Sequence, residues 1–237
     1  MGQAERRAEG GQSARRFLGT GQGAANPGGR YAAQALTAFT DYLLAAWSAW
    51  LALLLWRRER QLRQRTTRFW FGAFLATAIG AAAGGGFHGG TAGPDVGALL
   101  WKTAVMWVGM AAFFMVSATA FGVCRPRIRI WLIVPAAFEL ALYGYWMVWH
   151  DGFRYVVFDY ASAMLVVLLL SIQAWLRRGE RAAVWIGAGI LVSFAGVGVE
   201  AVGWPLYSRF NHDALYHLVQ AAALYLFYRG ATLARDR

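Results

Sequence analysis

The sequence predicts an all-α fold, a polytopic transmembrane bundle of seven helices. Hydrophobic residues make up 58% of the 237 positions and charged residues only 15%, whereas soluble domains are nearer half apolar and a quarter charged. Apolar runs of about 20 residues, the length that crosses a bilayer's hydrocarbon core, recur along the chain. Arginines gather in short clusters between these runs. Together these observations predict a multi-pass protein of the inner (plasma) membrane, and the richness in Arg, Ala and Gly is typical of a bacterial source.

The chain divides into three predicted segments. Residues 1–33 are rich in Gly, Ala, Gln and Arg and lack an apolar stretch able to act as a signal peptide, so we expect a disordered tail. Residues 34–229 form the membrane domain, and residues 230–237 a short basic tail. The expected spans are 36–56, 69–88, 100–123, 130–149, 154–175, 182–203 and 213–228. We find no internal repeat or linker of the kind that a transporter made of inverted repeats would contain.

The distribution of basic residues predicts the orientation, because cytoplasmic loops retain Arg and Lys. The first, third and fifth loops and the carboxyl tail hold 15 of the 23 basic residues. The short loops and helix ends of the opposite side hold Lys102, Arg154 and Arg209. We therefore expect the amino terminus outside and the carboxyl terminus in the cytoplasm. We interpret the net charge of +11 as the sum of these cytoplasmic basic clusters, which anchor the helix ends at the membrane surface. We therefore do not expect a nucleic-acid partner.

Glycines at four-residue spacing mark the second span, for example Gly80 with Gly84 and Gly85 with Gly89. Small residues at this spacing let helix backbones approach closely. The sixth span also contains several glycines. We expect close helix packing at both places, and the same pattern also suits a helix that passes near a ligand.

Ionisable side chains inside the predicted spans are functional candidates, since each costs roughly 2.5 to 3.5 kcal/mol near the bilayer centre. The alternating direction of the spans places nearly all of them at the outer end, with Glu139 near the middle. This predicts a polar cavity open to the outer side. The alternatives are side chains that extend to the interface or that pair with one another. The candidates are Asp41, His88, Lys102, Glu139, Asp159, Glu200, Asn211, His212, Asp213 and His217.

Three histidines suggest a metal site. Neutral imidazoles of His88, His212 and His217 are ligands of the kind that a catalytic zinc ion uses, with water at the fourth position. His212 and His217 are five residues apart, about 140° on a regular helix, so shared ligation requires His212 to precede the helix. Asp213, Glu200 or Asp95 would orient a ligand or act as general base, with Lys102 supporting the site.

The placement of these histidines resembles the seven-helix superfamily of alkaline ceramidases and progestin and adipoQ receptors. The resemblance implies zinc between the second and seventh helices and hydrolysis of amide-linked lipids. GGGFHGG matches the second-helix motif at His88, with Gly84 at its serine position, and HDALYH resembles the seventh-helix motif through His212 and His217. Asp95 or Lys102 would replace the third-helix aspartate. The chain is also similar to an uncharacterised family of bacterial seven-helix membrane proteins with TDYLL and an FNH-x-x-LYHLVQ-like seventh helix.

Two functions follow from these patterns. One is a zinc-dependent hydrolase that acts on a lipid or amphiphile. The other is a metal-free receptor or transporter in which Asp41, Glu139, Asp159 and Asn211 line a polar cavity for a small molecule. Membrane lipids and a lipid or small-molecule ligand are the expected partners, and the sequence predicts no oligomeric state. A purely structural alternative pairs Lys102 with Asp41 or Glu200.

Overall fold

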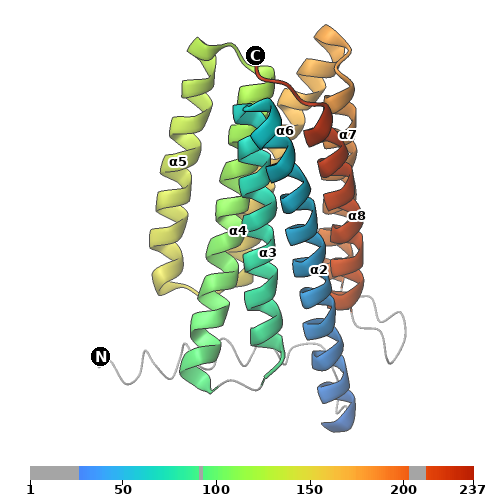
Figure 1. Ribbon diagram of the computed structural model, residues 1–237. Coiled ribbons are helices and arrows are strands. Elements are labelled where there is room, and N and C mark those ends of the chain that lie inside the picture. Colours follow the sequence, from blue (N-terminus) through green and yellow to red (C-terminus); the bar gives the residue numbers. More distant parts are fainter. Residues whose placement is uncertain (1–26, 91–92, 203–211) are drawn as a thin grey trace.

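The all-α prediction is confirmed by the computed structural model, which describes residues 27–90, 93–202 and 212–237. These residues form seven helices and no strand: α2 (Pro27–Leu62), α3 (Arg65–His88), α4 (Pro94–Val123), α5 (Pro126–Trp149), α6 (Phe153–Arg178), α7 (Arg181–Val202) and α8 (His212–Leu233). Within this part of the chain, six helices, α2 to α7, are long and apolar enough to cross a membrane. The chain is therefore an integral membrane protein, and α8 runs alongside the six (Figure 1).

The first helix is longer than the predicted span. It begins at Pro27, inside the predicted tail, and ends at Leu62. Proline suits the first helical turn because its φ is already helical. Arg, Glu, Gln and Leu then continue the helix through the basic stretch, because all four are strong helix formers. Arg63 stops it with a φ of 49°. Residues 1–26 lie outside the described part of the chain.

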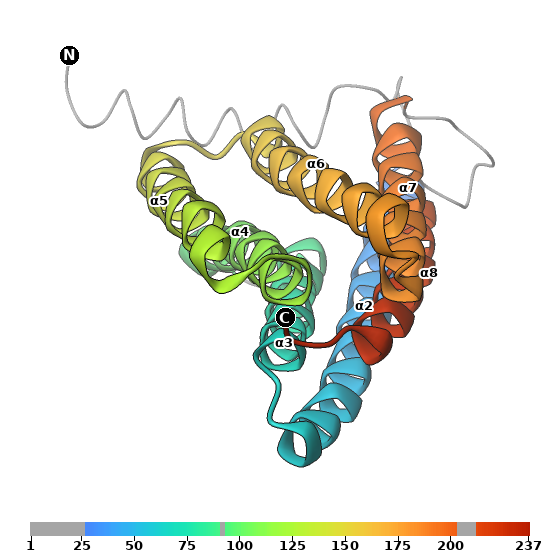
Figure 2. The same cartoon turned by 90° about the horizontal axis from the view of Figure 1, so that it is seen from above.

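Six of the described helices form a closed ring, and α5 lies outside it (Figure 2). Contacts run from α4 through α3, α2, α8, α7 and α6 and return to α4, while α5 packs mainly on the outside of α4. Sequential helices point in opposite directions (Figure 1). One end of the bundle therefore holds the starts of α2, α4, α6 and α8 and the ends of α3, α5 and α7, and we call it the polar end. The opposite end, with the arginine clusters, is the basic end.

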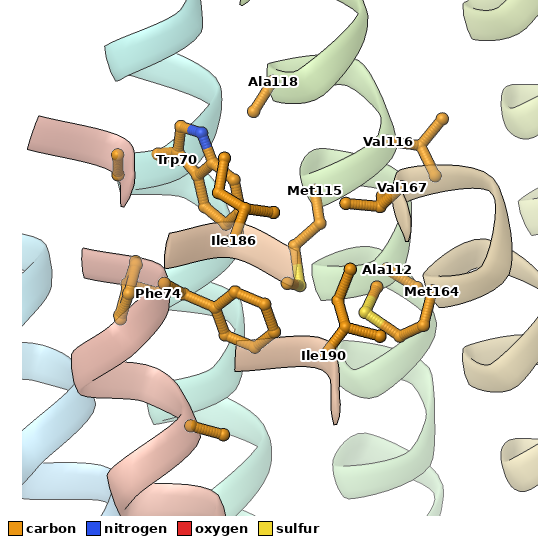
Figure 3. Close-up of a cluster of buried hydrophobic side chains, with 14 of the residues drawn as sticks. Trp70, Phe74, Ala112, Met115, Val116, Ala118, Met164, Val167, Ile186 and Ile190 are labelled. Carbon is orange, nitrogen blue, oxygen red and sulfur yellow. The ribbon is translucent and has the colours of Figure 1, made fainter. Parts of the chain in front are cut away.

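An apolar core lies inside the bundle, and Figure 3 shows part of it. Trp70 and Phe74 of α3 face Met115 of α4, and Met164 of α6 and Ile190 of α7 complete the contact. Each of these side chains is at most 5% exposed. The residues of this cluster include no charged side chain. Among the described residues, the buried aspartate and histidine side chains, Asp41, Asp159 and His217, lie toward the polar end.

Close packing at glycines is confirmed in the second span, at Gly85, and the structure adds a close contact at Gly230 of α8, which the sequence did not single out. A Cβ atom at Gly85 of α3 would lie 3.1 Å from ring carbons of Tyr42 on α2. A Cβ atom at Gly230 of α8 would lie 2.5 Å from a side-chain carbon of Ile186 on α7. The second distance leaves no room for any larger residue. The first contact holds α2 against α3 near the polar end, and the second holds α7 against α8 near the basic end.

The carboxyl tail closes the basic end. Asp236 accepts hydrogen bonds from the backbone N–H groups of Arg65 and Thr66, at 2.8 and 2.7 Å. These are first-turn donors of α3 that have no partner within the helix. A carboxylate at this position also interacts favourably with the helix dipole. The tail therefore caps α3 from a distant part of the sequence.

Candidate functional site

Asp41 is the centre of a buried polar cluster at the polar end. Its Oδ2 lies 2.7 Å from Nδ1 of His88, and its Oδ1 lies 3.2 Å from Nε2 of His217. Asp41 is on α2, His88 on α3 and His217 on α8. Asp41 is only 4% exposed and His217 only 8%. Three helices thus bring one carboxylate and two imidazoles together, and we call these residues the Asp41 cluster.

Glycine in α3 makes room for the carboxylate. A Cβ atom at Gly84 would lie 3.3 Å from Oδ1 of Asp41. The four-residue glycine spacing brings α3 close to α2, and the end of α3 then places His88 beside Asp41. The glycine-rich segment therefore packs closely on α2, as the sequence suggested, and the group that it approaches there is the Asp41 carboxylate; an approach to a ligand stays a prediction.

The hydrogen bond to Asp41 fixes the chemistry of His88. A carboxylate oxygen only accepts, so Nδ1 of His88 carries the proton. In the neutral ring Nε2 then holds a lone pair, and among the described residues nothing binds it. The His88 side chain is 26% exposed. A carboxylate that orients an imidazole in this way is the arrangement used by catalytic bases and by metal-binding histidines.

His217 is held from both sides. Its Nδ1 lies 2.9 Å from the hydroxyl oxygen of Thr40, and that hydroxyl lies 2.9 Å from the backbone carbonyl of Thr37. A protonated ring would donate to both Thr40 and Asp41. A neutral ring would donate to Asp41 and accept from the Thr40 hydroxyl. Thr40 satisfies either state by turning its hydroxyl, so the ring can gain or lose a proton without moving.

A second polar group lies beyond the threonines. Thr37 donates to Oδ2 of Asp213 at 3.2 Å, and Oδ1 of Asp213 lies 3.3 Å from Nε2 of His212. Both α8 residues are partly buried. His212 is the first residue of α8, near the position that shared ligation would require. It contacts Asp213 instead of joining His88 and His217.

The three predicted ligands therefore do not surround one point. Within residues 27–90, 93–202 and 212–237, no group of three His, Cys, Asp or Glu side chains is arranged to hold a metal ion. His88 and His217 meet at Asp41, a residue that the sequence assigned to a polar cavity and not to the metal site.

An apolar groove leads to the cluster along the seam of α2 and α8. Its volume is about 470 Å³. Thr40 and His217 are its polar members, and the rest of the lining is aliphatic or aromatic: Leu43, Leu44, Ala46, Trp47, Trp50, Leu218 and Ala221. Trp47 donates from Nε1 to the carbonyl oxygen of Ala221 at 3.2 Å, which joins the two helices. The groove opens on the helix surface that faces lipid.

Lys102 and Asp95 lie apart from the cluster. The Lys102 ammonium donates to carbonyl groups that end α5, including that of His150 at 3.1 Å, and pairs with Asp151 at 2.5 Å. The purely structural alternative paired Lys102 with Asp41 or Glu200. The structure instead places the Lys102 ammonium at the end of α5, where it caps the helix. Asp95 is exposed in the first turn of α4.

Two other predicted acids form a separate pair. Asp159 of α6 is buried beside Glu139 of α5, and neither of these two helices contacts α2. The side chain of Glu200 and the whole of Asn211 lie outside the described residues. The predicted cavity residues thus divide between the Asp41 cluster and the Glu139–Asp159 pair.

Sequence reasoning missed Thr37 and Thr40. Both are buried and bond to residues of α8. Their signal was present, because the polar residues Thr37, Thr40, Asp41 and Ser48 fall on one helix face. A polar stripe of this kind in an apolar span indicates a face turned toward other polar groups.

Residues 36–236 match the model of a family described as "Family of unknown function (DUF6962)". The chain belongs to this family. The match to DUF6962 covers all seven helices except the first residues of α2. No curated protein matches the chain. Membership of DUF6962 agrees with the predicted uncharacterised membrane family, whereas nothing in these comparisons supports the resemblance to ceramidases and adipoQ receptors.

Proposed function

We propose that the protein binds a membrane amphiphile, with its apolar chain in the groove between α2 and α8 and its polar head at the Asp41 cluster. The observation that supports this most strongly is His217, which lines the groove and also contacts Asp41. One residue therefore joins an apolar surface to a buried polar cluster. A ligand entering sideways from the lipid would reach both.

The residues of the groove suit the two parts of such a ligand. Leu43, Trp47 and Trp50 are 49%, 37% and 52% exposed at the lipid-facing surface. They offer contact to a hydrocarbon chain. The Thr40 hydroxyl oxygen would accept a hydrogen bond from a small head group beside His217, whose two ring nitrogens already contact Thr40 and Asp41. The lone pair of His88 Nε2 would accept a further hydrogen bond.

Photolabelling tests this proposal with an internal control. The probe is a diazirine analogue of palmitate in phosphatidylcholine vesicles that contain the protein, and labelled peptides are quantified by mass spectrometry. Trp131 and Phe138 of α5 are 77% and 71% exposed and report ordinary lipid contact. We expect the 43–50 segment to be labelled several-fold more per exposed area than α5.

Variants separate the polar and apolar contributions. His217→Ala should reduce groove labelling to the level of α5, and Ala46→Phe should do the same by filling the groove without touching the Asp41 cluster. His150→Ala is the matched control, because His150 lies at the same end but stacks on Trp146, with the ring centroids 3.9 Å apart. Equal labelling of the groove and α5 in the wild type would refute the proposal.

A zinc-dependent hydrolase is the second candidate, and the convergence of two imidazoles on one carboxylate favours it. Two histidines and a carboxylate match the ligand types of some catalytic zinc sites. Asp41, His88 and His217 would have to rearrange to hold the ion, because no three such side chains are arranged for a metal among the described residues; a bound zinc ion would supply an activated water. In the described arrangement, however, one ring nitrogen of each histidine already contacts Asp41, which is why binding of an amphiphile is the first proposal.

Zinc content decides between the candidates. Elemental mass spectrometry of the detergent-purified wild type is compared with a His88→Ala, His217→Ala double variant and with Asp95→Ala as control. About one zinc per chain in the wild type and control, and none in the double variant, would establish the metal centre. If no folded sample contains zinc, the hydrolase candidate is refuted. The photolabelling experiment then decides whether the protein binds an amphiphile.

A further inference from the structure

Asp159 presents a buried carboxylate with no hydrogen-bond donor among the described residues, because the group beside it is the carboxyl group of Glu139, which only accepts when it is ionised. It lies on α6, is 5% exposed, and neither of its oxygens is hydrogen-bonded there. The acidic group beside it is Glu139 of α5, which is only partly buried. An unpaired polar group of this kind costs free energy, and a charged one costs much more. The position therefore requires a partner of another kind.

The packing of α4 places the carboxylate there. A Cβ atom at Gly109 of α4 would lie 3.4 Å from Oδ2 of Asp159 and 2.7 Å from Cε1 of Tyr143. Gly109 is thus the surface against which the acid and the ring of Tyr143 both pack. The Tyr143 hydroxyl donates to the carbonyl oxygen of Val105 at 3.0 Å. The proton of the Tyr143 hydroxyl is therefore donated to Val105 and not to Asp159.

Cations near the pair already have other partners. Lys102 of α4 binds the end of α5 and Asp151. Arg154, at the start of α6, lies over the ring of Tyr155, 4.9 Å from its centroid. On the side of α6 that faces α7, the Tyr160 hydroxyl contacts Ser193 at 3.4 Å. Within the described residues, no cationic side chain faces Glu139 and Asp159.

The pair lies well inside its helices. Asp159 is six residues after the start of α6, about 9 Å along the axis. Glu139 is ten residues before the end of α5, about 15 Å along the axis. Neither short carboxylate reaches the polar end by extending its side chain. Two adjacent carboxylates at this depth would repel each other strongly if both were ionised with nothing between them.

We propose that Glu139 and Asp159 form a cation-binding site within the bundle, where one monovalent cation, a proton or an alkali-metal ion, is held between the two carboxylates. A bound proton would convert one carboxylate to a hydroxyl that donates to the other. An alkali ion would be held by oxygens of both. This site is separate from the groove and the Asp41 cluster, and its test does not depend on amphiphile binding.

Infrared spectroscopy of the purified protein distinguishes these states, because a protonated carboxyl group has a carbonyl band that an ionised one lacks. Spectra are recorded at neutral pH, first with choline and then with sodium as the only added cation. The variants are Glu139→Gln, Asp159→Asn and the double variant. Asp95→Asn, which changes an exposed carboxylate, is the matched control. Maleimide labelling of Cys124, which is buried, on heating shows that each variant is folded.

We expect the wild type and Asp95→Asn to show a protonated-carboxyl band in choline that the double variant lacks. Persistence of the band in sodium identifies the bound cation as a proton, and its disappearance in sodium identifies an alkali ion. Glu139→Gln, the less buried change, should alter the band on its own if Asp159→Asn fails to fold. A spectrum in choline that is identical in the wild type and in folded Glu139→Gln would overturn the proposal.

Discussion

Replacing Asp41 tests whether the cluster at the polar end is an interacting unit. Asp41→Ala removes the partner of both imidazoles, which lie 2.7 and 3.2 Å from its oxygens. Breaking a buried ion pair costs about 3–5 kcal/mol in soluble proteins, whereas single hydrogen bonds between membrane helices average about 0.6 kcal/mol. Because the substitution abolishes both interactions, we expect a destabilisation of about 1–3 kcal/mol. For a chain of this size, that lowers Tm by roughly 3–10 °C.

The chain contains its own reporter for this measurement. Cys124 is the only cysteine and is buried, so a maleimide dye that fluoresces on reaction follows thermal unfolding without further labelling. Asp95→Ala is the control, because it removes an exposed carboxylate from the same end of the bundle. His88→Ala should lose most of its effect in the Asp41→Ala background, since neighbouring groups couple. An Asp41→Ala protein that melts with the control, or effects that simply add, would refute the interacting cluster.

Three further predictions concern packing and the basic end. Gly230→Val should prevent α7 and α8 from packing, because even a Cβ atom would lie 2.5 Å from Ile186, and the protein should elute as aggregate in size-exclusion chromatography. Asp236→Ala should lower Tm by a few degrees in the maleimide assay, because the cap of α3 is worth about 1 kcal/mol; an unchanged Tm would show that the tail does not cap α3. Burial raises the pKa of the Cys124 thiol and outweighs the opposing effect of nearby arginines. The folded protein should therefore react with maleimide at pH 8 many-fold more slowly than the denatured protein, and equal rates would contradict this.

The sequence predicted the helices well because a bilayer restricts the choice of structure. Each apolar run of sufficient length must become a helix whose backbone satisfies its own hydrogen bonds. The alternating direction of the spans then places Asp41, His88 and His217 at the same end. Helix ends were less predictable: α2 extends to Leu62, because charged residues with high helix propensity continue a helix beyond the apolar span.

The partners within the site could not be predicted from the order of the spans. From the sequence, three histidines, His88, His212 and His217, were grouped by residue type. In the structure α2 packs between α3 and α8, so His88 and His217 both contact Asp41. The same packing separates Glu139 and Asp159 from the other acids. Which helices are neighbours depends on shape, such as the contact of Gly85 with Tyr42. That information is three-dimensional and does not appear in hydropathy.

The most direct test of amphiphile binding is a cryo-electron microscopy structure of the protein in a lipid nanodisc. We predict an elongated density along the seam of α2 and α8 that ends in a compact head within hydrogen-bonding distance of His217 or Thr40. That density should be stronger than the density of lipid along the exposed face of α5. A groove that is filled by side chains, or that holds only the weak density seen along α5, would contradict amphiphile binding.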